Sequence, residues 1–144
     1  MSDEAESEKL PLTDVWEAIR RAEKLLPGQA AAEEENDPRW QAIIKIGEFI
    51  REEPHAIWPF ILRWGTSPDE DLRDAVATCL LEHLLQHHFA RFFPQVEETA
   101  RKDPLFAKAF LVCWKFGQAA ESGNAERFIA LQAECRESER SENK

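Results

Sequence analysis

The stretch CLLEHLLQHH, residues 79–88, concentrates side chains that bind metals or act as nucleophiles. Its Cys79, His83 and His87 stand at positions i, i+4 and i+8. Two histidines four residues apart on one helix can reach a single zinc ion, as they do in the HExxH motif. This spacing makes His83 and His87 candidate metal ligands, although the catalytic glutamate of that motif is missing.

The distance between Cys79 and His87 limits the metal hypothesis. At about 1.5 Å of rise per residue, the two positions are about 12 Å apart along a helix. Zinc ligands lie only about 2.0–2.3 Å from the metal, so further ligands would have to come from other helices, and the sequence indicates none. We therefore expect no metal and no cofactor, with these histidines hydrogen-bonded to neighbouring helices, while a site on His83 and His87 stays open as the alternative.

Cys79 and His83 lie on one helical face and could form a thiolate–imidazolium pair. The helical neighbours of Cys79 are apolar, Val76 and Leu80, and cysteine is among the residue types most often buried. The chain has neither a glycine-rich phosphate loop nor a G-x-S-x-G motif. We expect a protein that is not an enzyme and has no catalytic residues.

Tryptophan and arginine gather in HAIWPFILRWG, residues 55–65, and an arginine lies among phenylalanines in FARFFPQ, residues 89–95. Packing between helices is one explanation of these stretches. A binding surface is the other, because tryptophan and arginine are enriched at interface hot spots. The residues expected on one shared surface are Trp58, Arg63, Trp64, Arg91, Arg101 and Lys102.

The composition indicates one helical domain. The 144 residues suffice for a single core, glycine is scarce, and the helix formers Ala, Leu, Glu, Arg and Gln dominate. Runs that alternate apolar and polar residues are hard to find, so we expect essentially no sheet. We divide the chain into a disordered acidic N-terminus (1–12), one helical domain (13–138) and a frayed polar C-terminus (139–144).

The net charge of −10 is uneven: residues 1–38 contribute −7, residues 39–120 only −1, and residues 121–144 −2. The absence of a basic excess argues against a nucleic-acid partner. Three widely spaced cysteines favour a reducing compartment over a disulfide framework. The polar start has no apolar leader, and no run approaches the roughly 18 apolar residues of a membrane span. We expect a cytoplasmic protein without membrane contact.

Helix signals recur along the chain. Thr13 is the expected N-cap of the first helix, and Asp37, Ser67 and Asp103 each precede a proline in the N-cap and N1 pattern. Ser67 also opens the best capping box, with Glu70 at its third position. The expected helices cover residues 14–26, 39–52, 54–64, 68–88, 90–102, 104–120 and 125–137.

The segment SPDEDLRDAVATCLLEHL, residues 67–84, resembles the first helix of a HEAT-type repeat. In that pattern an acidic, proline-marked turn precedes an arginine and small or aliphatic residues. The matching residues are Asp71, Leu72, Arg73, Ala75, Val76 and Leu80. The neighbouring units keep the turn and the apolar spacing more loosely, with Lys108 near the arginine position of the third, so the resemblance extends over about residues 37–138.

This resemblance implies an all-α fold, a short right-handed stack of about three antiparallel helical hairpins preceded by one N-terminal helix. A bundle of six or seven helices is the alternative. Because HEAT-type arrays are mostly scaffolds, the resemblance also implies binding rather than a reaction.

The leading functional hypothesis is a non-enzymatic protein–protein interaction module that binds a protein or peptide on its concave face. The acidic N-terminal third favours a basic partner, as for an acidic inhibitor or immunity-type protein. The alternative is a HEAT-like DNA-binding or DNA-glycosylase-type protein acting on alkylated bases, whose catalytic motif is not matched here. A metal-dependent protein built on His83 and His87 is the third hypothesis.

Overall fold

The computed structural model describes residues 14–26 and 38–142, and no strand is found in these ranges, which confirms the all-α prediction. The elements are α2 (Val15–Leu25), α3 (Pro38–Gly47), α4 (Pro54–Trp64), α5 (Glu70–Val76), the π-helix η2 (Ala77–Leu81), α6 (Glu82–Lys102), α7 (Pro104–Leu111), the 3-10 helix η3 (Gly117–Ala120) and α8 (Asn124–Glu142). Within the described ranges, every helix is too short or too polar to cross a membrane. The right-handed stack of HEAT-like hairpins stays a prediction.

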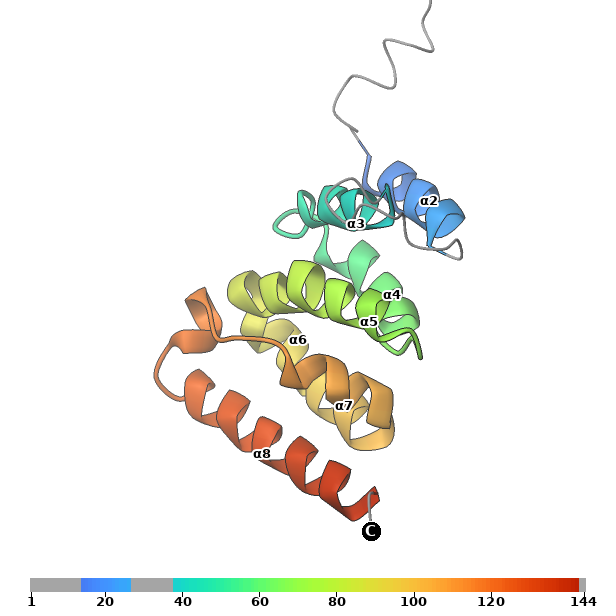
Figure 1. Cartoon of the computed structure of the whole chain (residues 1–144). Helices are drawn as coiled ribbons and strands as arrows, with labels where there is room; N and C mark the ends of the chain where they lie inside the picture. Colours follow the sequence, from blue (N-terminus) through green and yellow to red (C-terminus); the bar gives the residue numbers. More distant parts are fainter. Residues whose placement is uncertain (1–13, 27–37, 143–144) are drawn as a thin grey trace, which may run out of the picture.

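The helices are stacked in layers, with α2 and α3 at one end and α8 at the other (Figure 1). Helix α3 packs against α2 and η2, while α7 packs against α6 and α8. The short helix η3 lies against α6 and α8. Each layer therefore buries its apolar side chains against the layer before and the layer after it.

Phenylalanines join the last three long helices. On α6, the rings of Phe89 and Phe93 stack with centroids 4.4 Å apart. Phe110 on α7 lies 4.7 Å from Phe128 on α8 and 6.2 Å from Phe93. All four side chains are fully buried, and burying each such ring contributes about 1.5–3 kcal/mol.

Several expected helices are confirmed. Helix α4 has the expected bounds, and α2 differs from expectation by one residue at each end. The helical stretch from α5 through α6 is broken at His88, whose backbone has φ −140° and ψ 43°. This kink falls between the expected helices 68–88 and 90–102. The expected disordered N-terminus, residues 1–12, lies outside the described part of the chain.

Three helix ends were predicted wrongly. Helix α3 ends at Gly47 rather than residue 52, because the next residues form tight turns with N–H groups bonded three residues back. Helix α7 ends at Leu111 rather than residue 120, since Glu82 and Gln132 bond the backbone of Trp114 and Cys113 and residues 113–116 are not helical. Helix α8 runs to Glu142 rather than residue 137, so it includes residues 139–142, which were expected in the C-terminal tail.

Aspartates cap α2, α5 and α7. Asp14 caps α2 by accepting a 2.7 Å hydrogen bond from the backbone N–H of Trp16, while the expected cap, Thr13, lies outside the described residues. Asp69, not Ser67, caps α5, because its carboxylate accepts from two backbone N–H groups of the first turn. The expected cap at Asp103 is confirmed for α7.

Candidate functional site

The charged residues expected on one shared surface lie on α4 and α6, and most of them pair with carboxylates of this chain. Arg63 forms a 2.7 Å ion pair with Glu23 on α2, the first described helix. Arg101 forms a 2.9 Å ion pair with Glu134 on α8, the last helix. The partners of these two arginines therefore lie on helices at opposite ends of the stack (Figure 1), and the two guanidiniums are engaged within the chain.

Trp58 belongs to the core and not to the surface, so its prediction as an interaction residue was wrong. Only 8% of the residue is exposed. Its ring lies 5.7 Å from Phe92 and 6.1 Å from Phe106, between α4, α6 and α7. The alternative explanation of this tryptophan, packing between helices, is the one that its burial supports.

The other members of the predicted surface are engaged with close neighbours. Trp64 is half-buried, and the guanidinium of Arg63 lies 4.9 Å from its ring centroid. Arg91 is exposed, and its Nη1 lies 3.2 Å from Nε2 of His55. Lys102 pairs at 2.7 Å with Glu98 one turn earlier.

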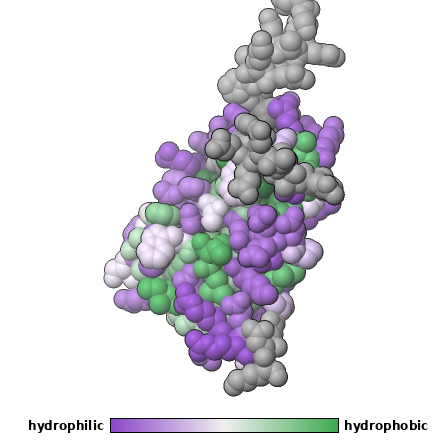
Figure 2. Space-filling view, viewed as in Figure 1, coloured by the Kyte–Doolittle hydropathy of each residue, from purple (hydrophilic) through white to green (hydrophobic). Residues whose placement is uncertain are grey.

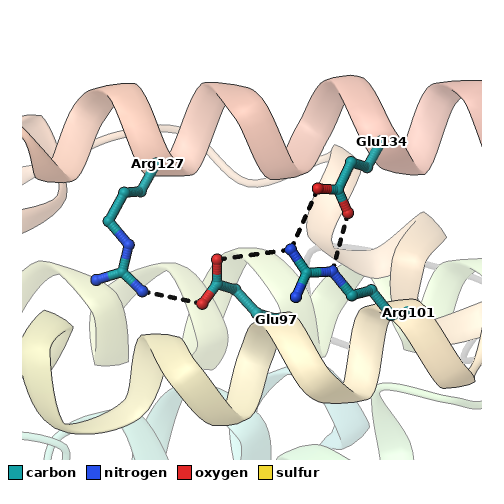
Figure 3. A network of polar contacts seen from close by, with 4 residues as sticks. All are labelled: Glu97, Arg101, Arg127 and Glu134. Atoms are coloured by element: carbon teal, nitrogen blue, oxygen red, sulfur yellow. Dashed lines mark hydrogen bonds and ion pairs between the residues drawn. The ribbon is translucent and has the colours of Figure 1, made fainter.

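A four-residue network joins α6 to α8, as Figure 3 shows. Arg101 donates two hydrogen bonds to Glu134, of 2.9 and 3.1 Å, and Arg127 pairs at 2.9 Å with Glu97. The pKa of Glu134 is lowered, mainly by the hydrogen bond from Arg101. These arginines are neutralised within the chain, and that arrangement gives no support to phosphate binding by them.

The CLLEHLLQHH stretch lines one side of a groove of about 400 Å³. The other side comes from the end of α3 and the turn that follows it. The lining residues are Ile44, Gly47, Glu48, Ile50, Arg51, Thr78, Cys79, His83 and His87. Among residues 14–26 and 38–142, no group of three or more His, Cys, Asp or Glu side chains is placed to hold a metal ion.

Cys79 and His83 line the groove without forming a catalytic pair. Nδ1 of His83 lies 3.0 Å from Oε1 of Gln86, which occupies that ring nitrogen. Burial raises the pKa of the Cys79 thiol, so the sulfur keeps its proton near neutral pH. A protonated thiol is a poor nucleophile, and this geometry does not favour nucleophilic catalysis.

The predicted residues do not include the most exposed aromatic surface, which lies in the segment between α7 and η3. In this segment Val112, Trp114 and Phe116 are exposed by 43%, 62% and 43%, whereas Cys113 between them is exposed by only 3%. Residues 113–116 are not helical, and Phe116 has extended backbone angles. We name Val112, Trp114 and Phe116 the aromatic strip.

Hydrogen bonds from three sides hold the aromatic strip in place. The backbone N–H of Trp114 donates to Oε2 of Glu82 on α6 at 2.8 Å. Nε2 of Gln132 on α8 donates to the carbonyl of Cys113 at 3.1 Å. After the strip, Gln118 accepts at 2.9 Å from the backbone N–H of Phe89 through its side-chain oxygen. The exposed rings are therefore presented by a fixed backbone.

Charges of both signs surround the aromatic strip: Nζ of Lys115 lies 4.4 Å from the ring centroid of Trp114, and two carboxylates lie nearby. Asp74 and Glu82 both lie near enough to raise the pKa of Cys113, although burial of that thiol is the larger cause. Neither carboxylate forms an ion pair with the described residues. In Figure 2, hydrophobic and near-neutral residues gather over the segment between α7 and α8, with hydrophilic residues around them.

A signal for the aromatic strip was present in the sequence. In VCWKF, residues 112–116, Val112, Trp114 and Phe116 recur with period two, as on one face of an extended segment. Extending the apolar pattern of α7 as far as residue 120 hid this short alternation. Gly117, the residue that ends the segment with φ +51°, was the second available signal.

Residues 28–130 match the model of a protein family described as a family of unknown function, DUF6869. The match covers more than half of the 144-residue chain. No curated protein and no solved structure matches the chain.

Proposed function

The chain belongs to the DUF6869 family of unknown function, and from its own geometry we propose that it is a non-enzymatic protein-binding module that contacts its partner through the aromatic strip. The observation that carries this proposal is the 62% exposure of Trp114 on a backbone held by Glu82 and Gln132. Tryptophan is the residue type most enriched at interface hot spots. A rigid backbone lowers the ordering entropy that binding costs.

The partner that the charge distribution favours is basic. The chain has a net charge of −10, and Asp74 and Glu82 near the strip are free of ion pairs with the described residues. Complementary charge speeds diffusional encounter and excludes partners of like charge. This combination suits an acidic inhibitor or immunity-type protein that covers a basic surface.

Two further features of the chain belong to the same proposal. The layered helices suit a short HEAT-like array, in which a chain of stacked hairpins presents a surface to a partner. Free thiols at Cys79, Cys113 and Cys135 suit a reducing compartment, and we propose the cytoplasm.

Affinity capture from the native host tests the proposal with two variants. Changing Trp114 and Phe116 together to Ala should abolish capture of the partner, because the exposed rings are lost. Trp16→Ala is the matched control, since Trp16 is 53% exposed on α2, far from the strip. In urea denaturation, the free energy of unfolding of both variants should lie within about 1 kcal/mol of the wild-type value, because substitutions at exposed positions usually change stability little. Equal capture by the wild type and the double variant would refute the proposed surface.

A further inference from the structure

The backbones of α3 and η2 approach closely at Gly47, which lines the groove between them. A Cβ atom added at this glycine would lie 3.3 Å from the carbonyl oxygen of Cys79 and 3.6 Å from Cδ2 of Leu80. On the opposite side, residues 77–81 form a π-helical turn, a distortion often found at functional sites. The turn places Thr78 and Cys79 on the groove wall, with His83 and His87 farther along the same side.

The groove combines apolar walls with one available cation. Ile44 and Ile50 line it, and Ile44 is 41% exposed, whereas Ile50 is only 2% exposed. Arg51 also lines it, is exposed, and forms no ion pair or side-chain hydrogen bond with the described residues. The carboxylate in the groove, Glu48, is paired at 3.4 Å with Lys45.

Two imidazoles also line the groove. His83 and His87 line the groove from α6, and burial together with the positive charge of Arg51 lowers the pKa of His87, which favours its neutral ring. Since Nδ1 of His83 is engaged by Gln86, its Nε2 remains for contacts in the groove. A carboxylate that enters the groove has the guanidinium of Arg51 as a cationic partner and ring N–H groups as hydrogen-bond donors.

We infer that the groove receives the C-terminal residue of a protein partner, with the carboxylate at Arg51 and an apolar side chain against Ile44. A terminal residue carries both groups on one Cα, whereas an internal Asp or Glu has a carboxylate but no apolar side chain beside it. The volume of about 400 Å³ lies within the range of about 300–1,000 Å³ that is typical of ligand sites. The inference rests on the proposed function, because the natural ligand of the groove is taken to be part of a protein partner.

Small probes test the groove without the partner. N-acetyl-leucine has the terminal carboxylate and the apolar side chain, and N-acetyl-leucinamide lacks only the charge. Titrations of the full chain, followed by amide NMR, should show N-acetyl-leucine shifting signals of Ile44 and His87, and the amide binding at least about tenfold more weakly. The α-amide of N-acetyl-glutamate, which mimics an internal acidic residue, should also bind more weakly than N-acetyl-leucine.

Two arginine variants complete the test. Arg51→Gln should weaken binding of N-acetyl-leucine by about tenfold. Arg136→Gln should not, because Arg136 is exposed on α8 at the far end of the stack. Equal affinity for the acid and the amide, unchanged affinity in Arg51→Gln, tighter binding of the glutamate probe, or no binding of N-acetyl-leucine would each overturn the inference.

The experiments distinguish failure of the proposed function from failure of this inference. Changing Trp114 and Phe116 to Ala should leave binding of N-acetyl-leucine unchanged, because neither residue lines the groove. If partner capture depends on the aromatic strip while N-acetyl-leucine does not bind, only the inference about the groove is overturned.

Discussion

The carboxylate of Glu82 accepts a 2.8 Å hydrogen bond from the backbone N–H of Trp114, 32 positions later in the chain. Glu82 is the first residue of α6, while Trp114 lies in the nonhelical segment after α7. This hydrogen bond connects the start of α6 to the backbone of Trp114, the most exposed tryptophan. It satisfies a backbone donor that a helix would have bonded internally.

Removing this acceptor should loosen the aromatic strip. Glu82→Ala is expected to lower the free energy of unfolding by about 1–2 kcal/mol, because a hydrogen bond to a charged group is lost. Glu82→Gln keeps an acceptor oxygen at the same length and should cost less. Urea denaturation measures both effects, and equal losses in the two variants would show that the bond contributes little.

Gly117 and Gly123 form a matched pair for separating backbone strain from crowding. Both have positive φ, at +51° and +86°. A Cβ atom at Gly117 would lie 2.7 Å from Cγ and 2.8 Å from the carbonyl oxygen of Gln86, whereas one at Gly123 meets nothing within 4 Å. Gly117→Ala should therefore cost about 2–4 kcal/mol and Gly123→Ala about 1 kcal/mol. Thermal or urea unfolding measures the two losses of stability, and similar losses in the two variants would argue against crowding at Gly117.

The three thiols should react in a fixed order. Cys79 is half-buried at the groove, while Cys113 and Cys135 are each only 3% exposed. Burial raises the pKa of all three thiols, that of Cys113 well above its ordinary value and that of Cys135 to about 11. Iodoacetamide with peptide mass spectrometry should find Cys79 alkylated first, because reaction needs both access and thiolate. In guanidinium all three should react, and earlier labelling of Cys113 in the native chain would contradict the described core.

Much of the helical order could be predicted because its causes are local. Apolar spacing and proline placement predicted α4, and the acidic cap before Pro104 predicted the start of α7. The end of α7 could not be predicted in this way. It depends on Glu82, Gln118 and Gln132, which provide hydrogen bonds from distant parts of the chain.

The candidate surface was harder to predict for a related reason. Residue type alone does not tell a buried tryptophan from an exposed one, and Trp58 and Trp114 have opposite environments. In the sequence there is no sign that the arginines are paired. In the structure, Arg63 and Arg101 each donate hydrogen bonds to a carboxylate more than thirty positions away. The histidine-rich stretch, residues 79–88, lines a groove because α3 packs beside it, and this packing could not be read from the sequence.

The pairing of Arg101 with Glu134 predicts a response to acid. The hydrogen bond from Arg101 lowers the pKa of Glu134 below its usual value of 4.5, so the folded state favours the ionised carboxylate. The resulting stability is present above the unfolded pKa and is lost as the pH falls through the folded pKa. Glu134→Gln should therefore lose less stability than the wild type between about pH 6 and pH 3. Urea denaturation across this range is the measurement.

Glu139→Gln is the control for the acid response, because Glu139 lies on the same helix and forms no ion pair with the described residues. It should keep the pH dependence of the wild type. An unchanged acid response in Glu134→Gln would show that screening by solvent cancels the contribution of this exposed pair.

Association with a basic partner should slow as salt is added. The Debye length falls from about 30 Å at 0.01 M to about 8 Å at 0.15 M ionic strength, which shortens the reach of Asp74 and Glu82 beside the aromatic strip. We expect the association rate to fall by about tenfold or more over this range, while the dissociation rate changes less. Asp74→Asn combined with Glu82→Gln should flatten the salt dependence, whereas Glu139→Gln on α8 should not. Stopped-flow mixing with the captured partner measures these rates. A rate indifferent to salt would contradict charge steering and leave the contacts of Trp114 and Phe116 as the basis of recognition.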